Sequence, residues 1–349
     1  MTTRRNAQKI PTVPGRKLYI LSGLAIAIIA LLVWLFPYIM TKTSQEAMIR
    51  IPQKATQQDV KDSLSKYFGD GFADRVLNIS RFPENNPAKR SGQYLIPKGV
   101  NPVSVMRRLT HGPQTPVKIT VNGFRSLDKL TDRISAKLNF PADSLRSLLA
   151  DPEIMSPYGL TPEQSLALFV DDTYELYWTA SPKDVIKKIG ANYLSIWNDK
   201  RRNKATILGL SPAEVMTVCS IVDEETNASS EKGTIGRLYI NRLNKGMKLQ
   251  ADPTVRFALG DFSIRRVRGT HLKTDSPYNT YRYAGLPPGP IRTTGKKTLD
   301  LVLDSEPNDY LYMCAKEDFS GTHNFASNYQ QHQENARKYQ KALDERGIK

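Results

Sequence analysis

The length, composition and charge of this chain exclude several classes of protein. Its 349 residues are too many for one small core and enough for two or three folded units. Hydrophobic residues make up 40% and charged residues 24%, as in globular proteins, and the two cysteines, Cys219 and Cys314, give no disulfide framework. We expect two buried thiols, with a single bridge as the alternative. The net charge of +16 indicates anionic surroundings such as phospholipid head groups, nucleic acid or an acidic polymer.

The first distinctive segment is an apolar stretch at 18–40. It has 23 residues without a charge, and at about 1.5 Å per residue a helix of this length crosses a hydrocarbon core of roughly 30 Å. Tyr19, Trp34 and Tyr38 lie near its ends, where amphipathic rings favour the membrane interface. A cleaved signal peptide is the alternative, but its apolar region is shorter, at about 7–15 residues, and precedes a small-residue cleavage site. We therefore predict a single uncleaved transmembrane helix.

The charges before this helix predict its orientation. Residues 1–17 contain no acid and five basic residues, which are Arg4, Arg5, Lys9, Arg16 and Lys17. The positive-inside rule keeps such a tail in the cytoplasm and places the chain after about residue 41 across the membrane. No second apolar run of this length follows. Because the exported part faces away from nucleic acid, lipid head groups and an anionic envelope polymer are the expected partners, and nucleic acid is not.

Residues 48–112 predict a small α+β module. "AMIRIP" is typical of a strand, and Thr56 and Asp59 have capping-box spacing before a helical pattern that continues to Pro83. "QYLIPKG" predicts a second strand, and Asn101 with Pro102 predicts the start of a helix that ends at Gly112. The module is either a spacer or a glycan-binding unit, and the pattern leaves both open.

A second and larger unit is expected to begin at 113. Pro113 and Pro116 mark the boundary, and "VKITV" after them predicts a strand. Farther along, the patterns predict helices around 126–138, 142–150 and 181–202, an apolar and aromatic stretch at 166–180, and a strand at 310–315.

A helix with a strong start signal leads to three consecutive acids. Ser211 and Glu214 form a capping box with proline at the first helical position. The acids are Asp223, Glu224 and Glu225. A run of charges usually marks a solvated surface, so the three positions need to be distinguished by the faces on which they lie.

The helical period distinguishes these acids. Val215, Val218, Ile221 and Val222 form one apolar stripe, and Glu225 occupies its next position. Glu224 follows Thr217 and Ser220 on the polar side, so we expect it to be solvated, and Asp223 lies on a flank. Apolar neighbours and the helix C-terminus both raise a carboxyl pKa, as a general acid near neutral pH requires. The alternative is a helix that has already ended, which leaves Glu225 on the surface.

Five motifs in this chain resemble the endolytic murein transglycosylases, the YceG-like family. They are "SIVDEET" (220–226), "INRLNKGMKLQADPTV" (240–255), "SPYNTY" (276–281), "GLPPGPI" (285–291) and "HNF" (323–325). They follow the order and spacing of the family, and the resemblance covers about 116–345. It implies an α+β fold with a single N-terminal transmembrane helix, a small LysM-like α+β module at 48–112 and a larger α+β catalytic domain at 113–349.

The resemblance also implies an activity and a site. The family cleaves the glycan strands of peptidoglycan with one glutamate, the acid before threonine in its Ser-Ile-Val-x-x-Glu-Thr motif, which is Glu225 here. Its carboxylic acid protonates the oxygen between MurNAc and GlcNAc, and its carboxylate then takes the proton of the C6 hydroxyl, which leaves a 1,6-anhydro end. The matched motifs imply these substrate-binding residues: Asp172, Tyr174, Gln250, Asp252, Asn279, Tyr281, His323 and Asn324.

Several of these residues have a structural alternative. Asp252 before Pro253 is equally typical of a turn or a cap, Asn279 of a local turn, and Tyr174 of an aromatic core. "GLPPGPI" is expected to shape a wall, and no spacing among the four histidines indicates a metal site, so we predict neither metal nor cofactor. The chain departs from the family at Asp223, where glutamate is usual, and at Asp171, where proline precedes Asp-Thr-Tyr.

The resemblance places the protein in the bacterial cytoplasmic membrane, beside enzymes that polymerise and cross-link glycan. Two alternatives stay open. One is a true muramidase, in which water replaces the C6 hydroxyl and Asp223 or Asp252 is the second carboxylate. The other is a non-catalytic peptidoglycan-binding scaffold.

Overall fold

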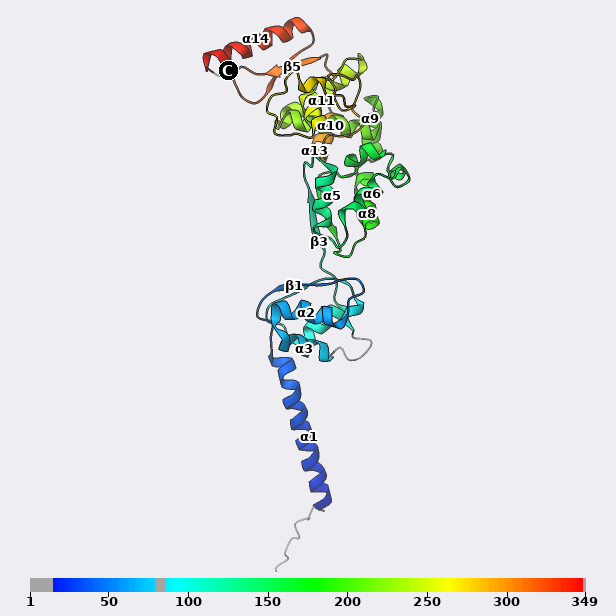
Figure 1. Cartoon of the computed structure of the whole chain (residues 1–349), viewed down its shortest axis with the longest axis vertical. Coiled ribbons are helices and arrows are strands. Elements are labelled where there is room, and N and C mark those ends of the chain that lie inside the picture. Colours follow the sequence, from blue (N-terminus) through cyan, green and yellow to red (C-terminus); the bar gives the residue numbers. More distant parts are fainter. Residues whose placement is uncertain (1–14, 80–85, 348–349) are drawn as a thin grey trace, which may run out of the picture. The chain divides into compact units, whose positions relative to one another are not determined.

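The computed structural model describes residues 15–79 and 86–347, with side chains from residue 19 onward. Its first helix, α1 (Gly15–Met40), covers the predicted transmembrane segment (Figure 1). The part Tyr19–Met40 is long and apolar enough to cross a membrane, and its apolar side chains are exposed, with Ile29 at 60%. Three of the basic residues used for orientation, Arg4, Arg5 and Lys9, lie outside the described residues, as do Pro83 and the end of the helical pattern before it.

The chain separates into two compact units, Met1–Thr115 and Pro116–Lys349. The boundary therefore lies three residues after the one that the sequence suggested, between 112 and 113. Hydrogen bonds give the reason, because the Thr115 amide donates to Gln93 O at 2.7 Å and the Thr115 hydroxyl accepts from the Leu95 amide at 2.9 Å. These bonds attach the segment after Gly112 to the first unit.

After α1, the described residues of the first unit form a two-stranded antiparallel sheet with three α-helices. Strands β1 (Ala47–Ile51) and β2 (Gly92–Ile96) pair with Ile49 opposite Tyr94. The helices are α2 (Gln57–Phe68), α3 (Asp70–Ile79) and α4 (Pro102–His111), with a short 3-10 helix, η2 (Pro87–Lys89), before β2. The capping box at Thr56 and the Asn101 cap are both confirmed. Both strands contribute fully buried side chains to one core.

The N-terminal half of the second unit again has an antiparallel strand pair, formed by segments far apart in the sequence. Strand β3 (Val117–Val121) pairs with β4 (Asp172–Leu176), so the apolar stretch at 166–180 is partly strand. The intervening helices are α5 (Leu127–Ser135), α6 (Ala142–Leu149), α7 (Pro152–Met155) and the 3-10 helices η3 (Ser156–Tyr158) and η4 (Pro162–Leu168).

The helix predicted at 181–202 is in fact two helices. They are α8 (Pro182–Ile196) and α9 (Asp199–Ile207). The break occurs because Trp197, which is 1% exposed, leaves the helical conformation and Asn198 caps the next helix by accepting a hydrogen bond from the Arg201 amide. The apolar period of the sequence continues across Trp197, but the cap at Asn198 begins a second helix there.

The C-terminal half contains the helix that carries the three acids. It comprises α10 (Pro212–Glu225), α11 (Ser229–Asn244), α12 (Asp252–Leu259), η5 (His271–Lys273), α13 (Lys296–Leu303), the antiparallel strands β5 (Tyr312–Ala315) and β6 (His323–Ala326), and α14 (Tyr329–Glu345). Helix α10 packs against α11, α12 and α13. The capping box at Ser211 is confirmed.

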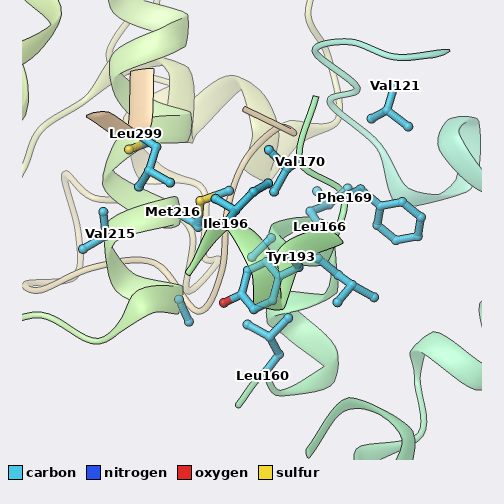
Figure 2. Packing of buried hydrophobic residues seen from close by; sticks show 14 of the residues in the cluster. Val121, Leu160, Leu166, Phe169, Val170, Tyr193, Ile196, Val215, Met216 and Leu299 are labelled. Carbon is cyan, nitrogen blue, oxygen red and sulfur yellow. The ribbon is translucent and has the colours of Figure 1, made fainter. Parts of the chain in front are cut away.

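Helix α10 is buried on every side. The predicted apolar stripe is buried, but so are Thr217 and Ser220 on the face that the sequence marked as polar, at 2% and 0% exposure. Their hydroxyls donate to main-chain carbonyls of α10 itself, and Ser220 also accepts from the Ile291 amide at 3.0 Å. A helix buried all round belongs to the centre of a core. Figure 2 shows part of this core, with Val215 and Met216 of α10 and Leu299 of α13 among the labelled side chains.

The two cysteines are free thiols. Cys219 is fully buried on α10, whereas Cys314 on β5 is half-buried. The expectation of two buried thiols is therefore correct for Cys219 only, and the bridge is not formed.

Candidate active site

Asp223, the first of the three acids, is held by α11 and α13. Lys232 forms an ion pair with its carboxylate, and the hydroxyls of Thr294 and Thr298 donate to it, that of Thr298 at 2.6 Å. Only 8% of its side chain is exposed. Asp223 is thus a structural carboxylate whose charge is neutralised inside the protein.

Glu224, the second acid, is also neutralised. Its Oε1 accepts from Nε of Arg125 at 2.7 Å and from Nη1 of Arg292 at 3.0 Å, and 6% of its side chain is exposed. The prediction that Glu224 is solvated is therefore wrong. Its polar neighbours on α10 are themselves buried, and the two arginines come from segments 99 and 68 residues away, which a helical period does not reveal.

Glu225, the third acid, has no cation bonded to it among the described residues. The Tyr239 hydroxyl donates to its Oε1 at 2.9 Å. Burial raises the pKa of Glu225 from 4.5 to about 7, the hydrogen bond from Tyr239 lowers it, and the charge of Asp252 raises it. Helix α10 does end at Glu225, but the carboxyl lines a pocket and is not a solvated surface group.

The pocket has a volume of about 360 Å³, within the range of small-ligand sites. It lies beside the ends of α10 and α12, and its wall is mostly polar. The lining residues are Glu224, Glu225, Leu238, Tyr239, Arg242, Leu249, Gln250, Asp252, Pro253, Arg256, Tyr281 and Met313.

Three of the sequence-predicted residues line this pocket with Glu225. Asp252 is the first residue of α12, and its Oδ1 accepts from the Tyr281 hydroxyl at 2.6 Å. Gln250 has a φ of 52°, a left-handed conformation that costs a non-glycine residue free energy, and its amide donates to Thr280 O at 3.1 Å. This strained main chain presents the Gln250 side chain to the pocket wall.

Asn279 supports the pocket from behind. It is fully buried, and its Nδ2 donates to the main-chain oxygens of Leu272 and Thr274 at 2.9 and 2.8 Å. Its Oδ1 accepts from the Tyr281 amide at 3.1 Å. Asn279 therefore fixes the turn that carries Tyr281, which is the structural alternative considered for it.

His323 and Asn324 lie on β6 and do not line the pocket. The main-chain amide and Nδ1 of His323 contact the buried carboxylate of Glu231 at 2.7 and 3.1 Å. Asn324 donates to Glu317 at 2.7 Å. Both side chains are thus engaged with acids of the protein itself.

Asp172 and Tyr174 lie on β4, also away from the pocket. Asp172 pairs with Lys296 at 3.5 Å. Tyr174 is 4% exposed, its hydroxyl donates to Val170 O at 2.6 Å, and burial raises its pKa. The structure supports the core interpretation of Tyr174.

Asp171, which departs from the family pattern, and the matched "GLPPGPI" motif both have structural roles. Asp171 is half-buried, and this burial raises the pKa of its carboxyl, which accepts from the Gly123 amide at 3.0 Å and the Thr293 hydroxyl at 2.5 Å. In the "GLPPGPI" wall, a Cβ on Gly289 would lie 2.1 Å from Glu163 O, so the main chain is too close there for any side chain. Neither feature alters the residues around Glu225.

The sequence reasoning missed three polar residues of the pocket, Tyr239, Arg242 and Arg256. Tyr239 and Arg242 are three apart on α11, and Arg256 is four after Asp252 on α12, so each pair shares one face of its helix. That spacing is visible in the sequence, but nothing in the sequence identifies which face meets the pocket. Within 15–79 and 86–347, no three or more His, Cys, Asp or Glu side chains are arranged so that they could hold a metal ion.

Comparisons with known proteins identify the family. The model of the YceG-like family matches residues 49–338, so the chain belongs to the YceG-like family. A Bacillus subtilis protein named endolytic murein transglycosylase is 32% identical over 47% of the chain, and one of the same name from Streptococcus pneumoniae is 23% identical over 82%. The matches cover 43% and 57% of those relatives, so the chain spans about half of their length.

A solved structure supports the same assignment. The crystal structure of a YceG-like protein from Listeria monocytogenes superposes with a TM-score of 0.55 and 26% sequence identity. The match covers 83% of this chain and 98% of that one. The family expected from the five motifs is thereby confirmed, as is the mixed helix and sheet class with one N-terminal apolar helix.

Proposed function

We propose that this protein is a membrane-anchored endolytic lytic transglycosylase, which cleaves the β-1,4 bond between MurNAc and GlcNAc in glycan strands and leaves 1,6-anhydro-MurNAc ends. The observation that carries the proposal is Glu225. It is the acid of the α10 end that lacks a cationic partner, and its pKa of about 7 suits proton transfer in both directions near neutral pH.

In the first step, protonated Glu225 donates its proton to the glycosidic oxygen as the bond from that oxygen to C1 of MurNAc breaks. The leaving GlcNAc hydroxyl takes the proton, and positive charge develops at C1 and the ring oxygen. Burial, the cause of the raised pKa, keeps the acid protonated up to about neutral pH. Tyr239, which donates to Oε1, leaves the other carboxyl oxygen to face the substrate.

In the second step, the Glu225 carboxylate takes the proton of the C6 hydroxyl of the same MurNAc, and that oxygen bonds to C1. The acid is regenerated and no water is consumed. The carboxylate of Asp252 and the amide oxygen of Gln250 supply negative potential for the oxocarbenium-like state, and Tyr281 orients Asp252 through its hydrogen bond.

A true muramidase is the second candidate, and Asp252 favours it. Asp252 lines the pocket with Glu225, whereas Asp223 is bonded to Lys232, Thr294 and Thr298 and is unsuited to act on water. A hydrolase would use Asp252 to direct a water molecule to C1. Product chemistry separates the two, because hydrolysis gives reducing ends.

The proposal extends to topology and partners. The apolar helix Tyr19–Met40 anchors the protein in the cytoplasmic membrane, and the basic tail keeps the N-terminus in the cytoplasm. The remaining chain then lies outside the cytoplasm, with peptidoglycan as its substrate, a LysM-like module at 48–112 and a catalytic domain predicted at 113–349, whose compact unit begins at Pro116. Peptidoglycan synthases are the partners proposed on the family resemblance.

Mass spectrometry of products from purified peptidoglycan tests the proposal. The full chain in detergent is expected to release anhydro-MurNAc ends, and Glu225→Gln is expected to release none although its Tm is no lower than that of wild type. Reducing ends would instead identify a hydrolase. An absence of products from a folded wild-type chain would favour a non-catalytic scaffold.

A further inference from the structure

Arg256 is a pocket cation whose hydrogen-bonding capacity the surrounding residues leave mostly unused. A guanidinium carries five N–H donors in a planar fork. Nη2 of Arg256 donates to Arg265 O at 3.3 Å, and Nε is buried and has no partner among the described residues. An unsatisfied buried donor costs free energy, so a site that retains one is suited to a ligand that supplies the acceptor.

The other arginines near the pocket have partners within the protein. Arg242 is 8% exposed and donates to the main-chain oxygens of Leu311 and Leu249 at 2.6 and 2.7 Å, so it braces the segment before α12. Arg125 and Arg292 neutralise Glu224. Glu224 compensates the charges of Arg125 and Arg292, and main-chain oxygens use the Nε and Nη1 donors of Arg242. No anion is paired with Arg256 among the described residues.

The pocket acids do not compensate Arg256 either. Asp252 is four residues earlier on α12, a spacing that allows an ion pair, yet its carboxylate is bonded to Tyr281. Glu225 is bonded to Tyr239, and with a pKa of about 7 it carries a full charge only at alkaline pH. The positive charge of Arg256 is therefore available to a ligand in the same pocket.

We propose that Arg256 binds a carboxylate of the substrate glycan and thereby selects strands that carry free muramyl or peptide carboxyl groups. This inference rests on the proposed function, because it places a glycan strand in the Glu225 pocket. The planar fork matches the two oxygens of a carboxylate. The carboxylate belongs either to the lactyl group of a peptide-free MurNAc or to a stem peptide, and the two sources share the same chemistry.

Occupation of Arg256 has a consequence for the acid. The positive charge of Arg256 lowers the pKa of Glu225. A carboxylate bound to Arg256 offsets that charge, so a correctly placed strand favours the protonated form of Glu225 that the first step requires. Recognition and protonation are thus coupled through one side chain.

Equilibrium binding in the catalytically silent Glu225→Gln background tests the assignment independently of turnover. The full chain in detergent is titrated by calorimetry with muramyl glycan oligomers, with their carboxyl groups free or converted to amides. Peptide-bearing and peptide-free oligomers are compared. Amidation is expected to weaken binding to the parent by about 10–100-fold, as for loss of a charge-assisted pair. With Arg256→Gln added, binding of the free acid weakens to a similar extent, and amidation then costs less than about twofold.

Matched variants sharpen the test. Arg256→Lys keeps the charge without the fork, so an intermediate affinity is expected. Arg266→Gln removes an exposed arginine from the neighbouring loop outside the pocket and is expected to bind like the parent. Dependence on peptide-bearing or on peptide-free oligomers identifies the carboxylate source, and either supports the assignment.

Two results would overturn the assignment of Arg256 as the residue that binds the carboxylate. One is an equal effect of amidation with and without Arg256, and the other is no effect of amidation on the parent, which is informative even if Arg256→Gln does not fold. A failure of the proposed function has a different signature, because product analysis of the unmutated chain would then show no anhydro ends whatever the binding cycle gives.

Discussion

Three consecutive acids at the end of α10 lie within one turn of helix, but two of them are bonded to cations and the third is not. Asp223 and Glu224 are each bonded to cations, Lys232 for the first and Arg125 with Arg292 for the second. Glu225, the next residue, faces a pocket and is bonded to a tyrosine hydroxyl. All three are glutamate or aspartate in the same helix, so residue type and element do not explain the difference.

The groups bonded to each carboxylate explain the difference between Glu225 and the other two acids. A carboxylate in the protein interior is stable as a charge when a cation compensates the lost hydration, and it becomes a proton donor near neutral pH when none does. The proposed general acid of this chain therefore needs no unusual residue. It is one carboxyl that lacks a bonded cation, next to two that have one.

The largest expected effect separates the acids by activity. Glu225→Gln is expected to lower kcat by about 10³-fold, the typical contribution of a general acid, with no fall in Tm. Glu224→Gln is expected to lower kcat by less than about tenfold and to reduce Tm, because it leaves Arg125 and Arg292 without their shared anion. Steady-state kinetics with calorimetric melting measures both, and equal losses of activity would remove the distinction.

The next effect concerns stability alone. Asp223→Asn removes the anion that compensates the half-buried Lys232, and we expect a loss of about 3 kcal/mol in the free energy of unfolding. For a unit of this size that corresponds to a fall in Tm of roughly 6–10 °C. Asp309→Asn, at an exposed position, is the matched control. A Tm equal to that of wild type would mean that the Asp223 pair contributes nothing.

A third and smaller effect is a gain in the stability of Glu225→Gln relative to wild type as the pH rises. The pKa of Glu225 is raised from 4.5 to about 7 on folding, so wild type loses stability as pH rises from 4.5 through 7 and loses no more above that. Glu225→Gln does not titrate, so its free energy of unfolding relative to wild type is expected to rise by about 2–3 kcal/mol between pH 5 and pH 8. Denaturant unfolding at the two pH values measures this, and a constant difference would contradict the raised pKa.

The smallest expected effect tests the tyrosine contact. Wild-type kcat is expected to fall above about pH 7, as Glu225 loses the proton that the first step needs. Tyr239→Phe removes a hydrogen bond that lowers the pKa of Glu225, so this alkaline limb is expected to move up by roughly half a pH unit. A limb that moves to lower pH would show that Tyr239 does not stabilise the carboxylate.

Local signals in the sequence predicted much of the fold. The capping residues Thr56, Asn101 and Ser211 all cap helices in the structure, because a cap depends on residues three positions apart. The prediction of one helix at 181–202 is wrong because it followed the continuous apolar period and disregarded the local capping signal at Asn198, where a second helix begins.

The site was predicted only in part, for a physical reason. Glu225 could be predicted from the sequence because the four apolar residues of its stripe precede it on the same helix. The environment of Glu224 could not be predicted, since Arg125 is 99 residues away in the sequence. The partner of Glu225 could not be predicted either, because Tyr239 belongs to another helix. The motif resemblance also predicted Gln250, Asp252 and Tyr281, which line the pocket. It did not distinguish them from Asn279, which does not line the pocket and instead fixes the turn that carries Tyr281.

The burial of α10 on all sides has a consequence for motion. A helix enclosed by core on every face exchanges its amide hydrogens only when the whole unit opens, so Glu225 is carried on one of the least mobile parts of the domain. Helix α12, which carries Asp252 and Arg256, is eight residues long and ends at an exposed glycine. A bulky polymer that enters the pocket is therefore expected to be accommodated by movement of α12, while Glu225, the proposed proton donor, stays where the core holds it.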